Sequence, residues 1–184
     1  MNVLDLVPVV LVIVYAALGF FSGIVRRLIG IVGVYISFLA ATNMGLQAGG
    51  ILQQTSNFEI PDARIYGFFG ILVVVIVVID GAAWLAKGQI KLEAIVFNRP
   101  IGVVVGVVTA FLLSVVVVHE LEAAGNPFGG PQLDSLESSI RSAVNGSHVA
   151  VPVTNKIGTP FIDLFQPFLP SDPQIYFSSS PVSP

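Results

Sequence analysis

Four long runs of apolar residues dominate this chain, and charge is nearly absent from them. They cover residues 6–25, 28–46, 65–86 and 101–118, and their single charged residue is Asp80. The hydrocarbon core of a bilayer is about 30 Å thick, so a spanning helix needs roughly 20 apolar residues. Inside hydrocarbon each backbone N–H must bond within its own segment, which favours helices despite the many Val and Ile residues. The runs predict an all-α membrane protein with four transmembrane helices.

Composition supports a membrane location and argues against several other classes. Hydrophobic residues make up 54% of the chain and charged residues 10%, whereas soluble domains carry about 25% charged residues. The net charge of -3 gives no electrostatic reason to expect nucleic acid as a partner. The chain contains no Cys, which excludes disulfides and thiolate ligands. The partner that composition predicts is the lipid bilayer.

Lys and Arg residues predict the orientation, because cytoplasmic loops are enriched in them. The gaps after the first and third runs hold five bases, which are Arg26, Arg27, Lys87, Lys91 and Arg99. The gap between the second and third runs holds Arg64, and no base precedes the first run. This distribution predicts a multi-pass membrane protein with those two gaps in the cytoplasm and both termini extracytoplasmic.

The predicted organisation is a membrane domain followed by a tail. The membrane domain covers residues 1–119, with spans at about 3–24, 27–46, 64–86 and 99–119. Residues 120–170 form an extracytoplasmic amphipathic tail, in which Leu136, Ile140 and Val144 recur at helical spacing and predict a helix near 135–145. A later apolar stretch is broken by Pro160 and Pro167, and lies either on the membrane surface or against the bundle. Residues 171–184 are predicted to be disordered.

Small residues recur at four-residue spacing within the spans. Membrane helices associate through close packing, which small side chains permit. The stripes predict helix contacts within the bundle or, for one of them, a homodimer face. Their members are Gly19 and Gly23 in the first span, Gly33, Ser37, Ala41 and Gly45 in the second, and Gly102, Gly106, Ala110 and Ser114 in the fourth.

Asp80 is the ionisable residue inside a span, where charges are costly and often functional. Three interpretations remain open: an ion pair with Arg99 or Lys87, a transport or proton-carrying role, and a solvated helix end. Asp80 lies about two helical turns from Lys87. We therefore favour an intramembrane ion pair, with Arg99 as the first-choice partner.

No pattern in the chain predicts catalysis. Ser147 and His148 have no nucleophile elbow around them. His119, Glu120 and Glu122 offer three possible metal ligands at one helix end, but a chain with two His residues in all is a poor candidate for a structured metal site. We predict no catalytic residue, no metal ligands and no cofactor.

Short motifs give the chain a resemblance to the colicin V production protein family. A Leu-Asp element stands at Leu4 and Asp5, Gly23 lies near the end of the first run and Arg26 directly after it, and residues 98–106 read NRPIGVVVG. The family positions are thus Asp5, Gly23, Arg26, Arg99, Gly102 and Gly106. The chain departs from the family pattern at Ser22, where an Arg is usual, at Arg27, where an acid is common, and at Asn98, which replaces Asp.

The resemblance implies a four-helix bacterial inner-membrane protein linked to toxin production or export and to the cell envelope, with no enzymatic mechanism. Two alternative functions belong to other classes of protein: a small oligomeric channel or transporter, and a membrane anchor whose tail recruits an extracytoplasmic protein. Assembly into a homo-oligomer is compatible with each of these functions.

Overall fold

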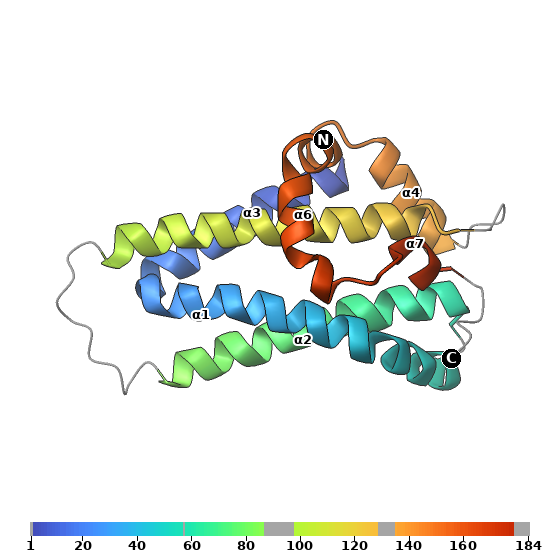
Figure 1. Ribbon diagram of the computed structural model, residues 1–184, viewed down its shortest axis with the longest axis horizontal. Coiled ribbons are helices and arrows are strands. Elements are labelled where there is room, and N and C mark those ends of the chain that lie inside the picture. Colours follow the sequence, from blue (N-terminus) through green and yellow to red (C-terminus); the bar gives the residue numbers. More distant parts are fainter. Residues whose placement is uncertain (1, 57, 87–97, 129–134, 179–184) are drawn as a thin grey trace.

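The computed structural model describes residues 2–56, 58–86, 98–128 and 135–178, and within them it is helical without strands (Figure 1). Three long helices form the bundle: α1 (Val3–Ser56), α2 (Ile60–Ala86) and α3 (Asn98–Gly125). Four helical segments in them are long and apolar enough to cross a membrane, namely Val3–Ile24, Arg26–Ser56, Ile60–Leu85 and Arg99–Gly125. The predicted all-α class with four candidate spans is confirmed.

Helix α1 supplies two of these segments because it bends back at Gly23. This residue has φ 75° and ψ 179°, a backbone conformation that is essentially restricted to glycine. The first half of α1 packs on α3, and the second half packs on α2 and on the tail (Figure 1). A single glycine therefore converts one continuous helical run into an antiparallel pair.

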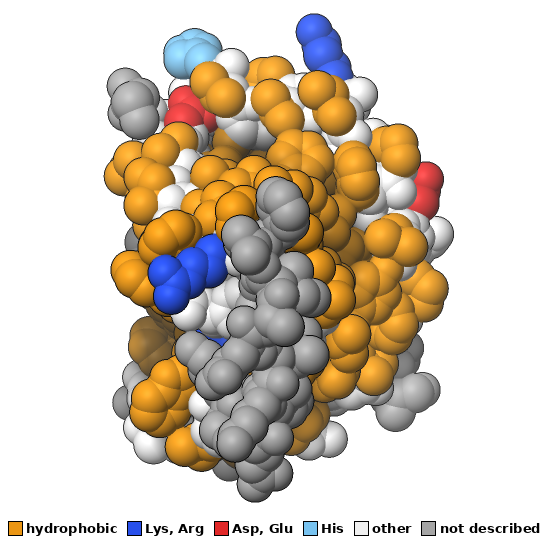
Figure 2. Space-filling view, turned by 90° about the vertical axis from the view of Figure 1, so that its left-hand side faces the viewer, with side chains coloured by type: hydrophobic (Ala, Val, Ile, Leu, Met, Phe, Trp, Pro, Cys, Tyr) orange, Lys and Arg blue, Asp and Glu red, His pale blue; other side chains and the backbone are white. Residues whose placement is uncertain are grey.

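Apolar side chains cover the outside of the bundle. Val73, Val74, Val77 and Val78 are 57–64% exposed on α2. Seen from the end of the bundle where α2 ends and α3 begins, hydrophobic side chains occupy most of the surface formed by the described residues (Figure 2). Such a surface is unfavourable in water and suits contact with lipid tails.

The tail contains α4 (Ser135–Asn145), as the spacing predicted, and then a broken helical run across the bundle. This run consists of α5 (Ala150–Val153), the π-helical turn η2 (Thr154–Gly158), α6 (Thr159–Phe165) and the 3₁₀ turn η3 (Gln166–Phe168). It lies crosswise over α3 and α1 (Figure 1). Of the two placements predicted for this stretch, the structure has the one against the bundle.

Aromatic side chains fasten the tail to the bundle. Phe165 packs on Phe38 with ring centroids 5.7 Å apart, and Tyr176 and Phe177 each lie 5.6 Å from the Phe68 ring.

The predicted disorder is wrong for residues 171–178. Pro173–Tyr176 form α7, and burial of the Phe177 side chain offsets the cost of ordering this segment. Burial, assisted by the Glu120 carboxylate, raises the pKa of the Tyr176 hydroxyl above its ordinary value. Residues 179–184 lie outside the described residues.

Candidate functional site

The bend at Gly23 gathers polar side chains that the spans otherwise exclude. The Arg27 guanidinium is completely buried, and its Nη2 atom lies 3.5 Å from Oδ1 of Asp80 on α2. Its Nε donates a hydrogen bond to the Ser22 hydroxyl over 3.2 Å. The guanidinium also lies over the Tyr15 ring, 5.5 Å from its centroid. Arg27 is thus held by an acid, a hydroxyl and an aromatic face within the apolar bundle.

Asp80 therefore has a different partner from the one expected. The structure pairs its carboxylate with Arg27, while the Arg99 guanidinium lies over the Phe20 ring at 5.7 Å. Arg26 also approaches Asp80, donating to its backbone carbonyl over 3.0 Å. The expectation of an Asp80–Arg99 pair is wrong because the reversal at Gly23 carries Arg27 inward against α2, whereas Arg99 is exposed. Lys87 lies outside the described residues.

Two departures from the family pattern meet at this site. Ser22 stands where the resemblance implies an Arg, and Arg27 stands where it implies an acid. In this chain the two side chains are hydrogen-bonded to each other. Arg27 supplies a positive charge at the bend and takes its acidic partner from α2.

Glycines bring the first and fourth spans into backbone contact beside the bend. A Cβ added at Gly19 would overlap the Gly102 carbonyl oxygen and lie 2.7 Å from its carbon. A Cβ at Gly102 would lie 3.0 Å from the Gly23 Cα, and one at Gly106 would lie 2.9 Å from the Tyr15 carbonyl carbon. These positions therefore lie in a helix–helix contact with no room for a side chain.

The second stripe faces α2 and the tail. A Cβ at Gly33 would meet Ile79, and one at Gly45 would lie 3.1 Å from the Phe68 Cα. The remaining stripe members are all buried, namely Ser37, Ala41, Ala110 and Ser114. Sequence reasoning missed the matching position on α2, where Gly67 meets Gly49 closely, although Ala63 and Gly67 have the same four-residue spacing.

Asp5 occupies a second polar site, where the first span meets the tail. Its carboxylate accepts hydrogen bonds from the Ser147 hydroxyl at 2.6 Å and from the backbone N–H groups of Val149 and Ala150 at 3.1 and 3.0 Å. The N–H of His148 adds a longer bond at 3.3 Å. Asp5 thus satisfies N–H groups that the start of a helix leaves free.

This arrangement explains the Ser147–His148 dipeptide without catalysis. The Ser147 hydroxyl donates directly to Asp5 and accepts from the N–H of Val151, while His148 contacts Asp5 through its backbone N–H. The imidazole is exposed. The serine is therefore a part of the cap, and no base is oriented toward it by these contacts.

Removing the Asp5 carboxylate is expected to loosen the start of the tail helix. In an Asp5→Ala variant, amide hydrogen exchange at residues 148–150 should accelerate by roughly tenfold or more, since their acceptor is lost. Asp5→Asn should show a smaller effect, because the side-chain amide oxygen can still accept hydrogen bonds from the N–H groups at the start of the helix. Exchange rates equal to those of the unmodified protein would contradict this role.

Comparison with models of known families matches residues 4–158 to one described as colicin V production protein. No curated protein and no solved structure shows a significant match. The matched region includes the Asp5 cap, the Gly23 bend, the Arg27–Asp80 pair and the glycine contact with α3. Among the described residues, no group of three or more His, Cys, Asp or Glu side chains is placed to hold a metal ion.

Proposed function

The chain belongs to the colicin V production protein family, and we propose that it is a non-catalytic integral membrane protein that acts in toxin production or export, or in maintenance of the cell envelope. The observation that carries the proposal is the extent of the match. It encloses almost the whole of the four candidate spans and continues into the tail that packs on them. The family assignment thus applies to the bundle and its tail together.

The polar side chains of the spans support a packing role better than a conducting one. A pore needs a row of polar groups facing water. Ser37, Thr109 and Ser114 instead donate to carbonyl oxygens one turn earlier in their own helices, over 2.6–2.7 Å. All three are at most 4% exposed. Within one bundle these hydroxyls are therefore committed to helix packing.

The tail is likewise held on the bundle. Besides the aromatic contacts, the Tyr35 hydroxyl donates to the Leu164 carbonyl over 2.8 Å, and Thr42 donates to the Phe168 carbonyl. A tail that serves mainly to recruit a distant enzyme would gain from being free. These contacts favour a tail that acts as a part of the membrane domain.

We place the protein in a bacterial cytoplasmic membrane with both termini outside. The distribution of Lys and Arg supports this orientation. The contact between Asp5 and residues 147–150 puts the N-terminus and the tail on one side of the bundle, as this orientation requires.

Complementation tests the proposal. A bacterial strain that lacks its own family member and carries the colicin V genes should release little toxin, measured as the inhibition zone on a sensitive lawn. Expression of this chain should restore the zone, and an Arg27→Gln variant should restore less. A chain that reaches the membrane at normal levels without restoring either the zone or an envelope defect of the strain would contradict the proposal.

A further inference from the structure

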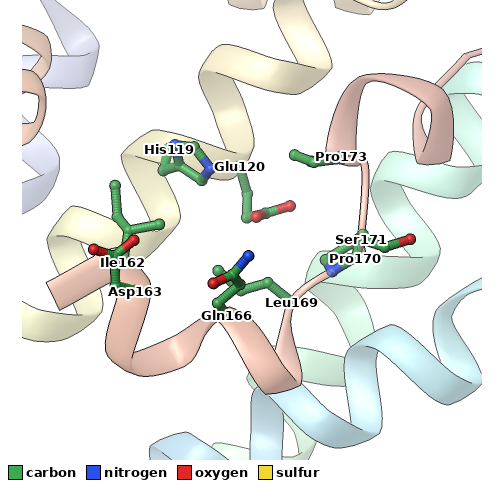
Figure 3. Close-up of a pocket in the computed structure, with 9 residues that line it drawn as sticks. All are labelled: His119, Glu120, Ile162, Asp163, Gln166, Leu169, Pro170, Ser171 and Pro173. Carbon is green, nitrogen blue, oxygen red and sulfur yellow. The ribbon is translucent and has the colours of Figure 1, made fainter. Parts of the chain in front are cut away.

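A cavity of about 150 Å³ lies between the C-terminal part of α3 and the tail. Helix α3 contributes His119 and Glu120 to its lining, and the tail contributes Asp163, Gln166 and Ser171 among others (Figure 3). It lies far from the Arg27–Asp80 pair, toward the opposite end of the spans. Nothing in the function proposed above uses it.

Glu120 is the unusual member of this lining. The residue is 0% exposed, and neither carboxylate oxygen has a hydrogen-bond partner among the described residues. Its side chain extends from α3 into the space before the tail, and the Gln166 amide faces it from η3 (Figure 3). A buried carboxylate without a partner is strongly unfavourable, so proteins pair or neutralise such groups.

The surroundings of Glu120 are acidic. Among its described residues, the cavity lining contains Glu120 and Asp163 and neither Lys nor Arg. A larger adjoining hollow of about 730 Å³ shares His119 and Pro173 with the cavity and adds Glu122 and Asp172, again without Lys or Arg. A hollow lined by one sign of charge attracts ions of the opposite sign.

Arg64, the base on the described part of α2, is engaged elsewhere. Arg64 donates to the backbone carbonyls of Tyr176 and Ser178 on the tail. Since the described lining residues also include no Lys or Arg, a cation that pairs with the Glu120 carboxylate would come from outside the described part of the chain. The described residues offer no cluster of three or more metal-ligating side chains, which favours a cation that carries its own hydrogen-bond donors.

We propose that the Glu120 cavity binds the primary ammonium group of a small organic cation, which enters through the adjoining acidic hollow. An ammonium group has three N–H donors. Its positive charge would neutralise Glu120 while one N–H donates to that carboxylate, and the Asp163 carboxylate in the same lining offers a further acceptor. The cavity has about five times the roughly 30 Å³ that a water occupies in the liquid, and it is smaller than the roughly 300 Å³ of the smallest drug-sized sites. It therefore suits an ammonium group with a few carbons.

Two kinds of molecule supply a primary ammonium group of this size: a soluble diamine and the headgroup of an ethanolamine lipid. The test uses the full chain in nanodiscs and follows its thermal unfolding midpoint. In one arm 1,4-diaminobutane is titrated into nanodiscs of phosphatidylglycerol and phosphatidylcholine. In the other arm phosphatidylethanolamine replaces the phosphatidylcholine and no diamine is added. Tetramethylammonium at equal ionic strength is the control cation, since it has charge but no N–H donor.

The midpoint should rise and saturate in at least one arm, and tetramethylammonium should leave it unchanged. A response to diamine alone identifies a soluble ligand, and a response to the ethanolamine lipid identifies the headgroup. In the Glu120→Gln variant, the ligand concentration that gives half of the midpoint shift should rise by about thirtyfold or more. A loss of affinity of this size is expected when a buried charge pair loses one partner. Glu59→Gln makes the same charge change at an exposed position and should respond like the unmodified protein.

Three results would overturn the proposal: no response of the unmodified protein in either arm, an equal response to tetramethylammonium, or an equal response of the Glu120→Gln variant. The first two need no variant, so the test holds even where Glu120→Gln fails to fold. Because the readout is ligand-dependent stability, a failure here is distinct from a failure of toxin complementation.

Discussion

Arg27→Gln is expected to destabilise the folded protein by about 3–5 kcal/mol, the usual cost of removing one partner from a buried ion pair. The substitution would leave the Asp80 carboxylate, which is 20% exposed, without its counter-charge inside an apolar bundle. Asp80→Asn should cost a comparable amount, because the fully buried Arg27 guanidinium would then lack its acid. Unfolding with denaturant in detergent micelles, followed by circular dichroism, measures both effects.

The double variant Arg27→Gln with Asp80→Asn should be more stable than the less stable of the two single variants, since it leaves no unpaired charge. Arg99→Gln is the matched control. Arg99 is exposed and its described contact is the Phe20 ring, a type of interaction worth about 0.5–1 kcal/mol at exposed sites. A strongly destabilised Arg99 variant beside a normal Arg27 variant would show that Asp80 pairs as the sequence suggested and not as the structure shows.

Gly106→Ala is the second substitution with a large expected effect. The added Cβ would overlap the backbone carbonyl of Tyr15, which cannot move away without separating the first half of α1 from α3. Overpacking of this kind costs about 1–3 kcal/mol. The displacement should also weaken the neighbouring contact between Gly19 and Gly102, and place the expected loss at the upper end of that range.

Gly70→Ala provides the control for this substitution. Gly70 lies within α2, and a Cβ there meets nothing within 4 Å. It should be neutral or stabilising by up to about 1 kcal/mol, because alanine favours helix over glycine. The thermal midpoint and the yield of monodisperse protein in detergent measure both variants. Equal thermal midpoints and yields for the Gly106→Ala and Gly70→Ala variants would mean that α3 does not pack closely on α1 at Gly106.

The spans could be predicted because their signal is local. A run of about 20 apolar residues needs no knowledge of its neighbours to be recognised. The same holds for α4, whose apolar residues recur at helical spacing. The conformation of Gly23 gave no comparable signal, because a glycine inside an apolar run is equally compatible with a continuous helix and with a bend.

Partners distant in sequence were harder to predict. Asp80 was identified as the costly charge within a span, but its partner depended on the path of the chain through Gly23. Arg99 was the nearer base in sequence, whereas the bend brings Arg27 to Asp80. Glu120 was considered only as a weak metal ligand, since its burial depends on a tail whose packing no local pattern specified. The stripe of Gly102 and Gly106 could be predicted, because close helix packing leaves a periodic signature.

We propose that the chain crosses a membrane four times with both termini outside, and single-cysteine labelling tests this topology most directly. The chain has no native Cys, so each introduced thiol is the only one present. Ser56→Cys, at the exposed end of α1, should react with a membrane-impermeant maleimide in intact cells. Lys91→Cys, between α2 and α3 and outside the described residues, should react only after permeabilisation. Labelling of Lys91→Cys in intact cells, with or without labelling of Ser56→Cys, would contradict the account.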